Sequence, residues 1–438
     1  MDWKSIYKSK VVTAREAISH IKSGDAIVTA FGCGQPYAVE RALADDFERL
    51  HDVTIHSMIY LKETPWIDDK FKGHIRYNTL FASASNRKAI TEGKVDYTPC
   101  HFSEIPMVLK EYIKPRVTMM SVTPPDENGY VSLGTTVDYI ESTLHYCDLK
   151  IAQVNKYMPY TYGNAVKHIS EFDYFVECDE PLPEVPSAPL SDVELAIGKN
   201  CASLIKNGDC IQLGIGGIPN AICENLKDKK DLGLHSELVG DGVVPLLKSG
   251  VINNSKKQTH TGKTVLGLAF GTKVLFDYIN QNKDVEIHPI EYVNNPYEIA
   301  KNDNFISINS CLQVDLMGQV VSDSIGLNQF SGAGGQVDFV RGATMSKGGK
   351  SIIAMPSTAK NNSISKIVPT ITANSAITTS RNDVDRIVTE YGIAELKGKT
   401  LKDRAKALIK IAHPNFRNDL IKVFEERFKT DYLEKINN

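Results

Sequence analysis

The segment that indicates the fold reads CIQLGIGGIPNAICENL at residues 210–226 and is soon followed by LHSELVGDG at 234–242. The apolar run before Gly214 predicts a strand, and the glycines after it predict a tight turn. Pro219 predicts the start of a helix, because proline is favoured at the first helical position. Glycines let a ligand approach the backbone, and the N–H groups of a helix start favour an anion. Glu237 lies in the next apolar segment, so the sequence predicts a phosphate-binding turn and a carboxylate, both at strand ends.

The same pattern occurs earlier in the chain, which indicates an internal duplication. Four features recur in one order: AISHIKSGD at 17–25 and CASLIKNGD at 201–209, G-x-P-x-A from Gly34 and Gly217, His-Ser at 56–57 and 235–236, and D-x-x-G-x-V from Asp126 and Asp315. Repeats that keep their order are typical of duplicated structural units. The fold predicted is therefore α/β, with two similar open domains that have mostly parallel sheets.

A proline-rich linker separates the two predicted domains. DEPLPEVPSAPL at 179–190 holds four prolines, and Ser191 with Glu194 then predicts a capped helix start. The predicted domains are residues 1–185 and residues 186–438, the second carrying Glu237. Short apolar runs, among them AITTS at 376–380, alternate with helical patterns in the chain. This alternation favours parallel sheets, which bind ligands at the carboxyl ends of their strands.

Composition excludes several classes of protein. The net charge of -3 gives no electrostatic basis for binding nucleic acid or an anionic membrane. No apolar run is long enough for a membrane span, and MDWKSIYKSKVV at the start has no signal-peptide core. The 8 cysteines are scattered without C-x-x-C pairs, which predicts reduced thiols and a cytoplasmic protein. The 11 histidines show no metal-binding spacing, so no metal site is expected.

Comparison of the two halves singles out Glu237. The second copy reads His-Ser-Glu at 235–237 where the first reads His-Ser-Met at 56–58, so the architecture does not require a carboxylate there. An ion pair or exposure to solvent is the ordinary alternative for a glutamate. The turn could also be purely structural, since the first copy has a similar one. A nucleotide-binding dehydrogenase is disfavoured, because Pro219 stands where the third glycine of G-x-G-x-x-G would fall.

A second glycine cluster, SGAGGQVDF at 331–339, occurs only in the second half. Its backbone N–H groups could stabilise an oxyanion on a thioester or anhydride carbonyl. Asn309 could supply another donor, although a local backbone hydrogen bond is an equal alternative. Lys366 could contact a phosphate, whereas most lysines face water.

Five segments together resemble one family. GIGGIPNA, HSELVGDGVV, SGAGGQVDFVRGA, SKIVP and TEYGIAELKGK are similar, in this order, to the acetyl-CoA hydrolase/transferase group of class I CoA-transferases. The resemblance extends from MDWK at the start to IAHPNF near the end of the chain. It is specific for the family and less specific for the acyl group.

The resemblance implies a ping-pong transfer of CoA between acetyl-CoA or butyryl-CoA and a carboxylate such as 4-hydroxybutyrate, as in fermenting bacteria. Glu237 would be the nucleophile that forms a glutamyl-CoA thioester. The implied CoA-binding residues are Gly214, Ile215, Gly216, Gly217, Ile218, Pro219, Leu312, Gly335 and Lys366, and the implied oxyanion residues are Asn309, Gly334 and Gly335. The expected partners are acyl-CoA and short-chain carboxylates, with no metal or redox cofactor, in a homodimer or dimer of dimers. Alternatives are an acyl-CoA hydrolase, a butyryl-CoA:acetate transferase and a non-enzymatic ligand sensor.

Overall fold

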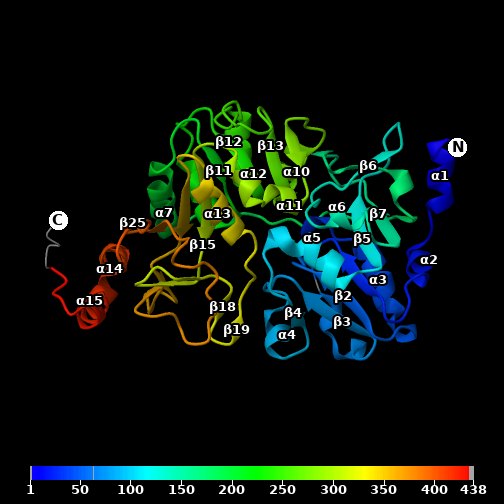
Figure 1. Cartoon of the computed structure of the whole chain (residues 1–438). Coiled ribbons are helices and arrows are strands. Elements are labelled where there is room, and N and C mark those ends of the chain that lie inside the picture. Colours follow the sequence, from blue (N-terminus) through cyan, green and yellow to red (C-terminus); the bar gives the residue numbers. More distant parts are fainter. Residues whose placement is uncertain (1, 63, 434–438) are drawn as a thin grey trace. The chain divides into compact units, whose positions relative to one another are not determined.

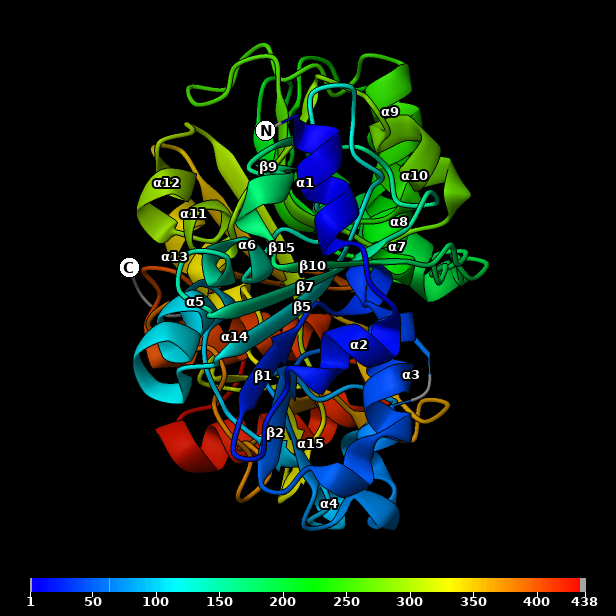
Figure 2. The ribbon, with the colours of Figure 1, turned by 90° about the vertical axis from the view of Figure 1, so that its right-hand side faces the viewer.

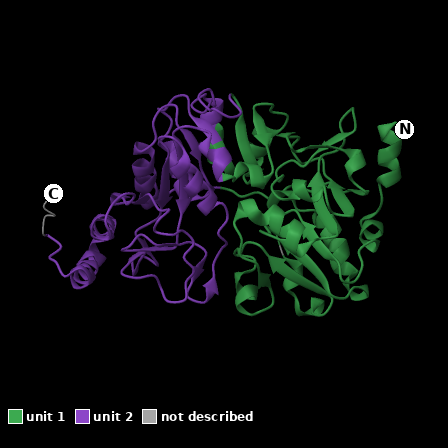
Figure 3. Cartoon of the chain, viewed as in Figure 1, with its two compact units in different colours: residues 1–186, 235–244, 262–295 green, residues 187–234, 245–261, 296–438 purple. Residues whose placement is uncertain are grey.

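The computed structural model describes residues 2–62 and 64–433. Strands alternate with helices along the chain (Figure 1). The contacts between residues divide the chain into two compact units (Figure 3). Unit 1 consists of residues 1–186, 235–244 and 262–295, and unit 2 of residues 187–234, 245–261 and 296–438.

Unit 1 contains a parallel sheet of order β10-β7-β5-β1-β2-β3-β4. Its strands are β1 (Ala26–Thr29), β2 (Val53–Ser57), β3 (Ile75–Thr79), β4 (Asp96–Tyr97), β5 (Val117–Val122), β7 (Leu149–Val154) and β10 (Tyr174–Glu177). Ile27 on β1, Ile55 on β2 and Ile151 on β7 lie in one core without solvent exposure. Helices α2 (Ala14–Ser19) and α3 (Tyr37–Asp45) pack side by side along this sheet (Figure 2).

A second group of parallel strands also belongs to unit 1. Strand β12 (Gly233–Val239), which belongs to unit 1 from His235 onward, pairs with β13 (Thr264–Ala269). Strand β13 pairs in turn with β14 (Val285–Ile287), and β14 pairs with β8 (Tyr162–Gly163). Short helix α11 (Ile290–Val293) follows β14. The pairing of β8 with β14 joins segments that are far apart in the sequence.

Unit 2 contains the parallel strands β11 (Cys210–Gln212), β15 (Phe305–Ser310), β20 (Lys350–Ala354) and β24 (Arg386–Thr389), paired in that order. Strand β25 (Gly392–Glu395) pairs antiparallel with β24. The main helices are α7 (Asp192–Ser203), α8 (Gly217–Glu224), α13 (Gln336–Met345), α14 (Leu401–Ile411) and α15 (Pro414–Phe428). The apolar faces of α14 and α15 pack into a second core with residues such as Val314, Ile367 and Ile387.

The parallel α/β architecture predicted from the sequence is confirmed. Residues 179–190 hold no helix or strand, and Ser191 and Glu194 form the predicted capping box of α7. AITTS at 376–380 was wrongly predicted as a strand: only Thr379 makes an isolated bridge, with Val320. Thr378 instead uses its hydroxyl, which donates to Asp323 and accepts from the Ser322 N–H, so side-chain bonds replace a strand ladder there.

Strand pairing repeats between the halves of the sequence. In the first, β1 pairs with β2 and β5, β2 with β3, β3 with β4, β5 with β7, and β7 with β10. In the second, β11 pairs with β12 and β15, β12 with β13, β13 with β14, β15 with β20, and β20 with β24. The two patterns are the same in sequence order, which supports the duplication inferred from the repeats. Among the described residues, no helix is long and apolar enough to cross a membrane.

Candidate active site

Glu237 belongs to unit 1 and lies inside β12, two residues before the last strand residue Val239, rather than after the strand as predicted. Its side chain is half-buried. On the adjacent strand β13, a Cβ on Gly267 would lie 2.9 Å from the carbonyl oxygen of Glu237. Glycine at 267 therefore allows the two strands to approach closely at the position of the carboxylate.

Asn294 holds the carboxylate. Its Nδ2 donates to Oε2 of Glu237 across 2.7 Å, and its side chain has no exposed surface. Asn294 follows α11 and caps it through a bond from its own N–H to the carbonyl oxygen of Ile290. A second bond ties the same segment to β12, because Nε2 of His235 lies 2.7 Å from the carbonyl oxygen of Val293. Asn294 could not be identified from the sequence, because it lies 57 residues from Glu237 and in no recognisable motif.

The first half has no counterpart of this arrangement. Met58 stands in the place of Glu237 and is 3% exposed, following β2. His56, the counterpart of His235, is buried, and this burial lowers its pKa to about 4. The position thus holds an apolar side chain in one half and a hydrogen-bonded carboxylate in the other.

In unit 2, the predicted turn follows β11 directly. Ile215 and Gly216 are exposed, so a ligand can reach the backbone of the turn. Helix α8 begins at Gly217, and Pro219 is its third residue, not its first as predicted. Proline is tolerated there because the N–H groups of the first helical turn have no intrahelical partner.

Glycine is required at positions 216 and 217 of this turn for different reasons. Gly216 has φ +106° and open space around its missing Cβ, so the backbone conformation demands glycine. A Cβ on Gly217 would lie 1.7 Å from Oε1 of Glu194, so close packing against the start of α7 demands it. The turn is therefore built into the junction of α7 and α8.

Asn309 lies beside this turn, near the end of β15. Gln212 on β11 joins the two strands: its Oε1 accepts from the N–H of Ile308 at 2.9 Å, and its Nε2 donates to the Ile308 carbonyl at 3.2 Å. Nδ2 of Asn309 lies 3.4 Å from the same Oε1. The structure thus links Asn309 to β11, the strand that precedes the turn, through Gln212, a buried residue that belongs to no recognisable motif.

The second glycine cluster leads into a helix. Gly334 has φ +54°, and Gly335 is the N-cap of the ten-residue α13, with no side-chain cap. The first N–H groups of such a helix favour an anion or an oxyanion. Helix α13 connects β15 to β20, so its start lies toward the carboxyl ends of these parallel strands, as does the Gly214–Pro219 turn after β11.

Leu312 and Lys366 lie in bends beside short strands of unit 2: Leu312 precedes β16 (Gln313–Asp315), and Lys366 lies between β22 (Ile364–Ser365) and β23 (Ile367–Val368). Leu312 is half-buried, and its N–H donates to the carbonyl of Val321. Burial lowers the pKa of Lys366, while the nearby Cys311 and Glu390 oppose this shift. Lys366 is half-buried and partly desolvated.

An exposed glycine turn follows one of the parallel strands, and a buried amide binds a glutamate within another strand. Together they define an α/β protein with a candidate ligand site and a candidate nucleophile. The model of the acetyl-CoA hydrolase/transferase N-terminal domain matches residues 1–186, and that of the C-terminal domain matches residues 271–424. The chain belongs to the acetyl-CoA hydrolase/transferase family.

Relatives cover the whole length of the chain. A 4-hydroxybutyrate coenzyme A transferase of Clostridium kluyveri is 50% identical over 98% of this chain and 100% of its own. A butyryl-CoA:acetate CoA-transferase of Anaerostipes caccae is 38% identical over 97% and 98%. Among solved structures, RipA from Yersinia pestis is 37% identical with a TM-score of 0.93, over 98% of this chain and 100% of that one. A 4-hydroxybutyrate CoA-transferase from Porphyromonas gingivalis is 41% identical with a TM-score of 0.85, over the same shares.

Proposed function

We propose that this protein transfers CoA between a short-chain acyl-CoA, such as acetyl-CoA or butyryl-CoA, and a carboxylate such as 4-hydroxybutyrate. Full-length relatives named as CoA-transferases support the reaction class. The observation that carries the mechanism is the bond from Asn294 to Oε2 of Glu237. Through this bond, Oε2 accepts a short hydrogen bond from a buried amide, which orients the carboxylate.

In the first step, Oε1 of Glu237 attacks the thioester carbonyl carbon. The C–S bond breaks, CoA leaves as a thiolate, and an acyl-glutamyl anhydride forms. The thiolate then attacks Cδ of Glu237, and the negative charge develops on Oε2, to which the Asn294 amide donates. The Cδ–Oε1 bond breaks, the first carboxylate leaves with Oε1, and a glutamyl-CoA thioester remains. A second carboxylate reverses these steps and leaves as the new acyl-CoA.

The residues of unit 2 are assigned to the CoA part of the substrate. The turn from Gly214 to Pro219 and the start of α13 at Gly335 would offer backbone N–H groups to phosphate or thioester oxygens. Lys366 would add a positive charge, with Asn309 and Leu312 near the thioester and the CoA chain. The chemistry needs no metal or redox cofactor, since both substrates carry the groups that react.

We also propose a cytoplasmic homo-oligomer, either a dimer or a dimer of dimers. None of the eight cysteines, all of which lie within the described residues, forms a disulfide, as is usual in a reducing compartment. Gel filtration with light scattering tests the subunit number. A monomer at working concentration would contradict this part of the proposal.

Trapping the intermediate tests the mechanism. The protein is incubated with butyryl-CoA alone and treated with borohydride or hydroxylamine, and the modified residue is mapped by mass spectrometry. We expect modification at Glu237, none in Glu237→Gln, and full modification in the control Glu16→Gln, which changes an exposed carboxylate of α2. An unmodified wild-type protein would contradict a covalent mechanism and favour a ligand sensor.

Adding acetate distinguishes transfer from hydrolysis. In protein that has not been treated with borohydride or hydroxylamine, a transferase converts the CoA bound to Glu237 into acetyl-CoA faster than free CoA accumulates in solution. If CoA instead accumulates at the same rate with and without acetate, water is the acceptor and the protein is an acyl-CoA hydrolase.

A further inference from the structure

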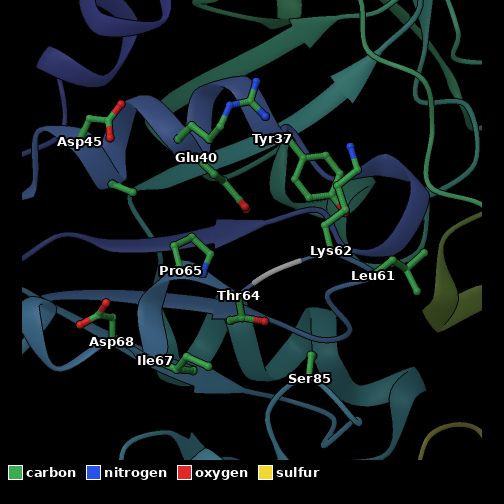
Figure 4. A pocket seen from close by; sticks show the side chains of 12 residues that line it. Tyr37, Glu40, Asp45, Leu61, Lys62, Thr64, Pro65, Ile67, Asp68 and Ser85 are labelled. Atoms are coloured by element: carbon green, nitrogen blue, oxygen red, sulfur yellow. The ribbon is translucent and has the colours of Figure 1, made fainter.

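Unit 1 contains a cavity whose lining residues include neither Glu237 nor Asn294. The cavity has a volume of about 1030 Å³ and lies between α3 and the segment that follows β2 (Figure 4). The lining residues that bear charge or a buried polar group include Glu40, Arg41, Asp45, Lys62, Thr64 and Asp68. This volume is sufficient for a small organic ligand.

Glu40 is the buried acid of this cavity. It is 2% exposed, and Figure 4 shows its carboxyl group directed from α3 toward Pro65 and Thr64. Three neutral donors reach it: Thr29 at 2.8 Å and Tyr60 at 3.3 Å on Oε1, and Gln35 at 2.5 Å on Oε2. Burial raises the pKa of Glu40 to about 7, despite these donors.

No cation among the described residues forms an ion pair with Glu40. Arg41 is bound to Glu180, and its side chain is 57% exposed. Nζ of Lys62 lies over the ring of Tyr37, 4.2 Å from its centroid. The buried carboxylate is therefore uncompensated, and a cation that entered the cavity would relieve the cost of its burial.

Two further polar atoms beside the cavity have no hydrogen-bond partner among the described residues. They are Oγ1 of Thr64, which is 6% exposed and lines the cavity, and Oε1 of Gln35, the residue that donates to Glu40. An amide oxygen can only accept a hydrogen bond, whereas a hydroxyl group can either donate or accept one. Buried acceptors without donors are costly, so a ligand that carries N–H or O–H donors would be stabilised by these atoms.

We infer that this cavity binds a small organic cation with a primary ammonium group, whose N–H groups donate to Glu40 and Thr64. Its alkyl part would pack against Ala44, Leu61 and Ile67. The exposed carboxylates Asp45 and Asp68 line the same cavity and favour a cation as well. Among the described lining residues, three carboxylates would repel an anionic ligand, whereas Lys62 and the paired Arg41 are the cations.

Calorimetric titration of the full chain with n-butylammonium chloride at pH 8 tests this site, with 1-butanol and sodium butyrate as probes of equal length. We expect binding of the ammonium compound alone. Glu40→Gln keeps the shape of the side chain and removes its charge, so it should weaken binding about tenfold. Thr64→Val should weaken it by a smaller factor, and the control Glu48→Gln, an exposed acid of the same unit, should not change it.

Thermal melting of each variant identifies any that fails to fold. If Glu40→Gln does not fold, Thr64→Val carries the test. The inference is overturned if n-butylammonium does not bind, if it binds equally to the wild type and the folded variants, or if butyrate binds more tightly. Since no step of this test measures CoA transfer, its result is independent of the proposed function.

Discussion

At the residue scale, Asn294 and Glu237 form the smallest part of the molecule with an assigned chemistry. We predict that Asn294→Ala lowers kcat by about 10²–10³-fold, as for the loss of one oxyanion donor, and leaves CoA binding intact. Steady-state kinetics and calorimetry with CoA measure the two effects. Asn282→Ala is a matched control, because its amide bonds only to the backbone of α10 (Lys273–Ile279) and its own turn. Equal losses in both variants would contradict a role for Asn294 in the reaction.

Glu40 gives a prediction on pH. Its pKa is raised from 4.5 to about 7, so the folded state retains the proton to a higher pH than the unfolded state. The stability contributed by Glu40 is therefore present below pH 4.5 and falls as the pH rises toward 7, by up to about 3 kcal/mol. Urea unfolding at pH 5 and pH 8 should show that Glu40→Gln gains stability relative to the wild type at the higher pH. A difference that is the same at both pH values would contradict the assigned shift.

The sequence could identify Glu237 but not the residues around it. Comparison with Met58 showed that the carboxylate is not needed for the fold, and this reasoning needs only the repeat. Asn294 and Gln212 could not be found in the same way. They are common polar residues whose roles depend on which distant strand or helix end lies beside them.

At the element scale, the junction of α7 and α8 explains the glycine turn. Gly217→Ala places a methyl group against Glu194 of the capping box, whereas Gly216→Ala strains only the backbone. Each change should destabilise the protein by about 1–3 kcal/mol and weaken CoA binding. The second change Glu194→Ala should restore much of the loss in Gly217→Ala and none in Gly216→Ala. Urea unfolding measures both pairs, and equal rescue would contradict this distinction.

Most strands of four or more residues were predictable, because they coincide with short apolar runs. LKIAQV, for example, is β7 in full. Boundaries near glycine and proline were less predictable, since Gly217 is already helical and Pro219 fits the first turn of α8. AITTS has the composition of a strand, but its hydroxyl groups bond to neighbouring loops and no ladder forms.

At the scale of the whole molecule, the repeats divide the sequence into halves, whereas the contacts form two units that cross this division. Residues 235–244 and 262–295 belong to unit 1. These later residues belong to unit 1 because they pair with strands and loops of the first half of the chain. Strand β8 pairs with β14, Thr136 forms a bridge with Leu268, and the N–H of Asp138 donates to the carbonyl oxygen of Gly267. Such pairings leave no periodic signal in the sequence, so the repeats alone could not indicate them.

This division predicts that kinetic effects separate by unit. The proposed CoA-binding residues belong to unit 2, and Glu237 and Asn294 belong to unit 1. Lys366→Ala should raise KM for every acyl-CoA by a similar factor, about tenfold for the loss of one charge-assisted hydrogen bond, with a smaller change in kcat. Glu237→Gln should abolish turnover and leave CoA binding unchanged. Initial rates over a matrix of both substrates measure the two parameters, and Lys347→Ala serves as an exposed control in unit 2. If Lys366→Ala changed kcat and left KM unaltered, Lys366 would act in the chemical step, and its assignment to CoA would be wrong.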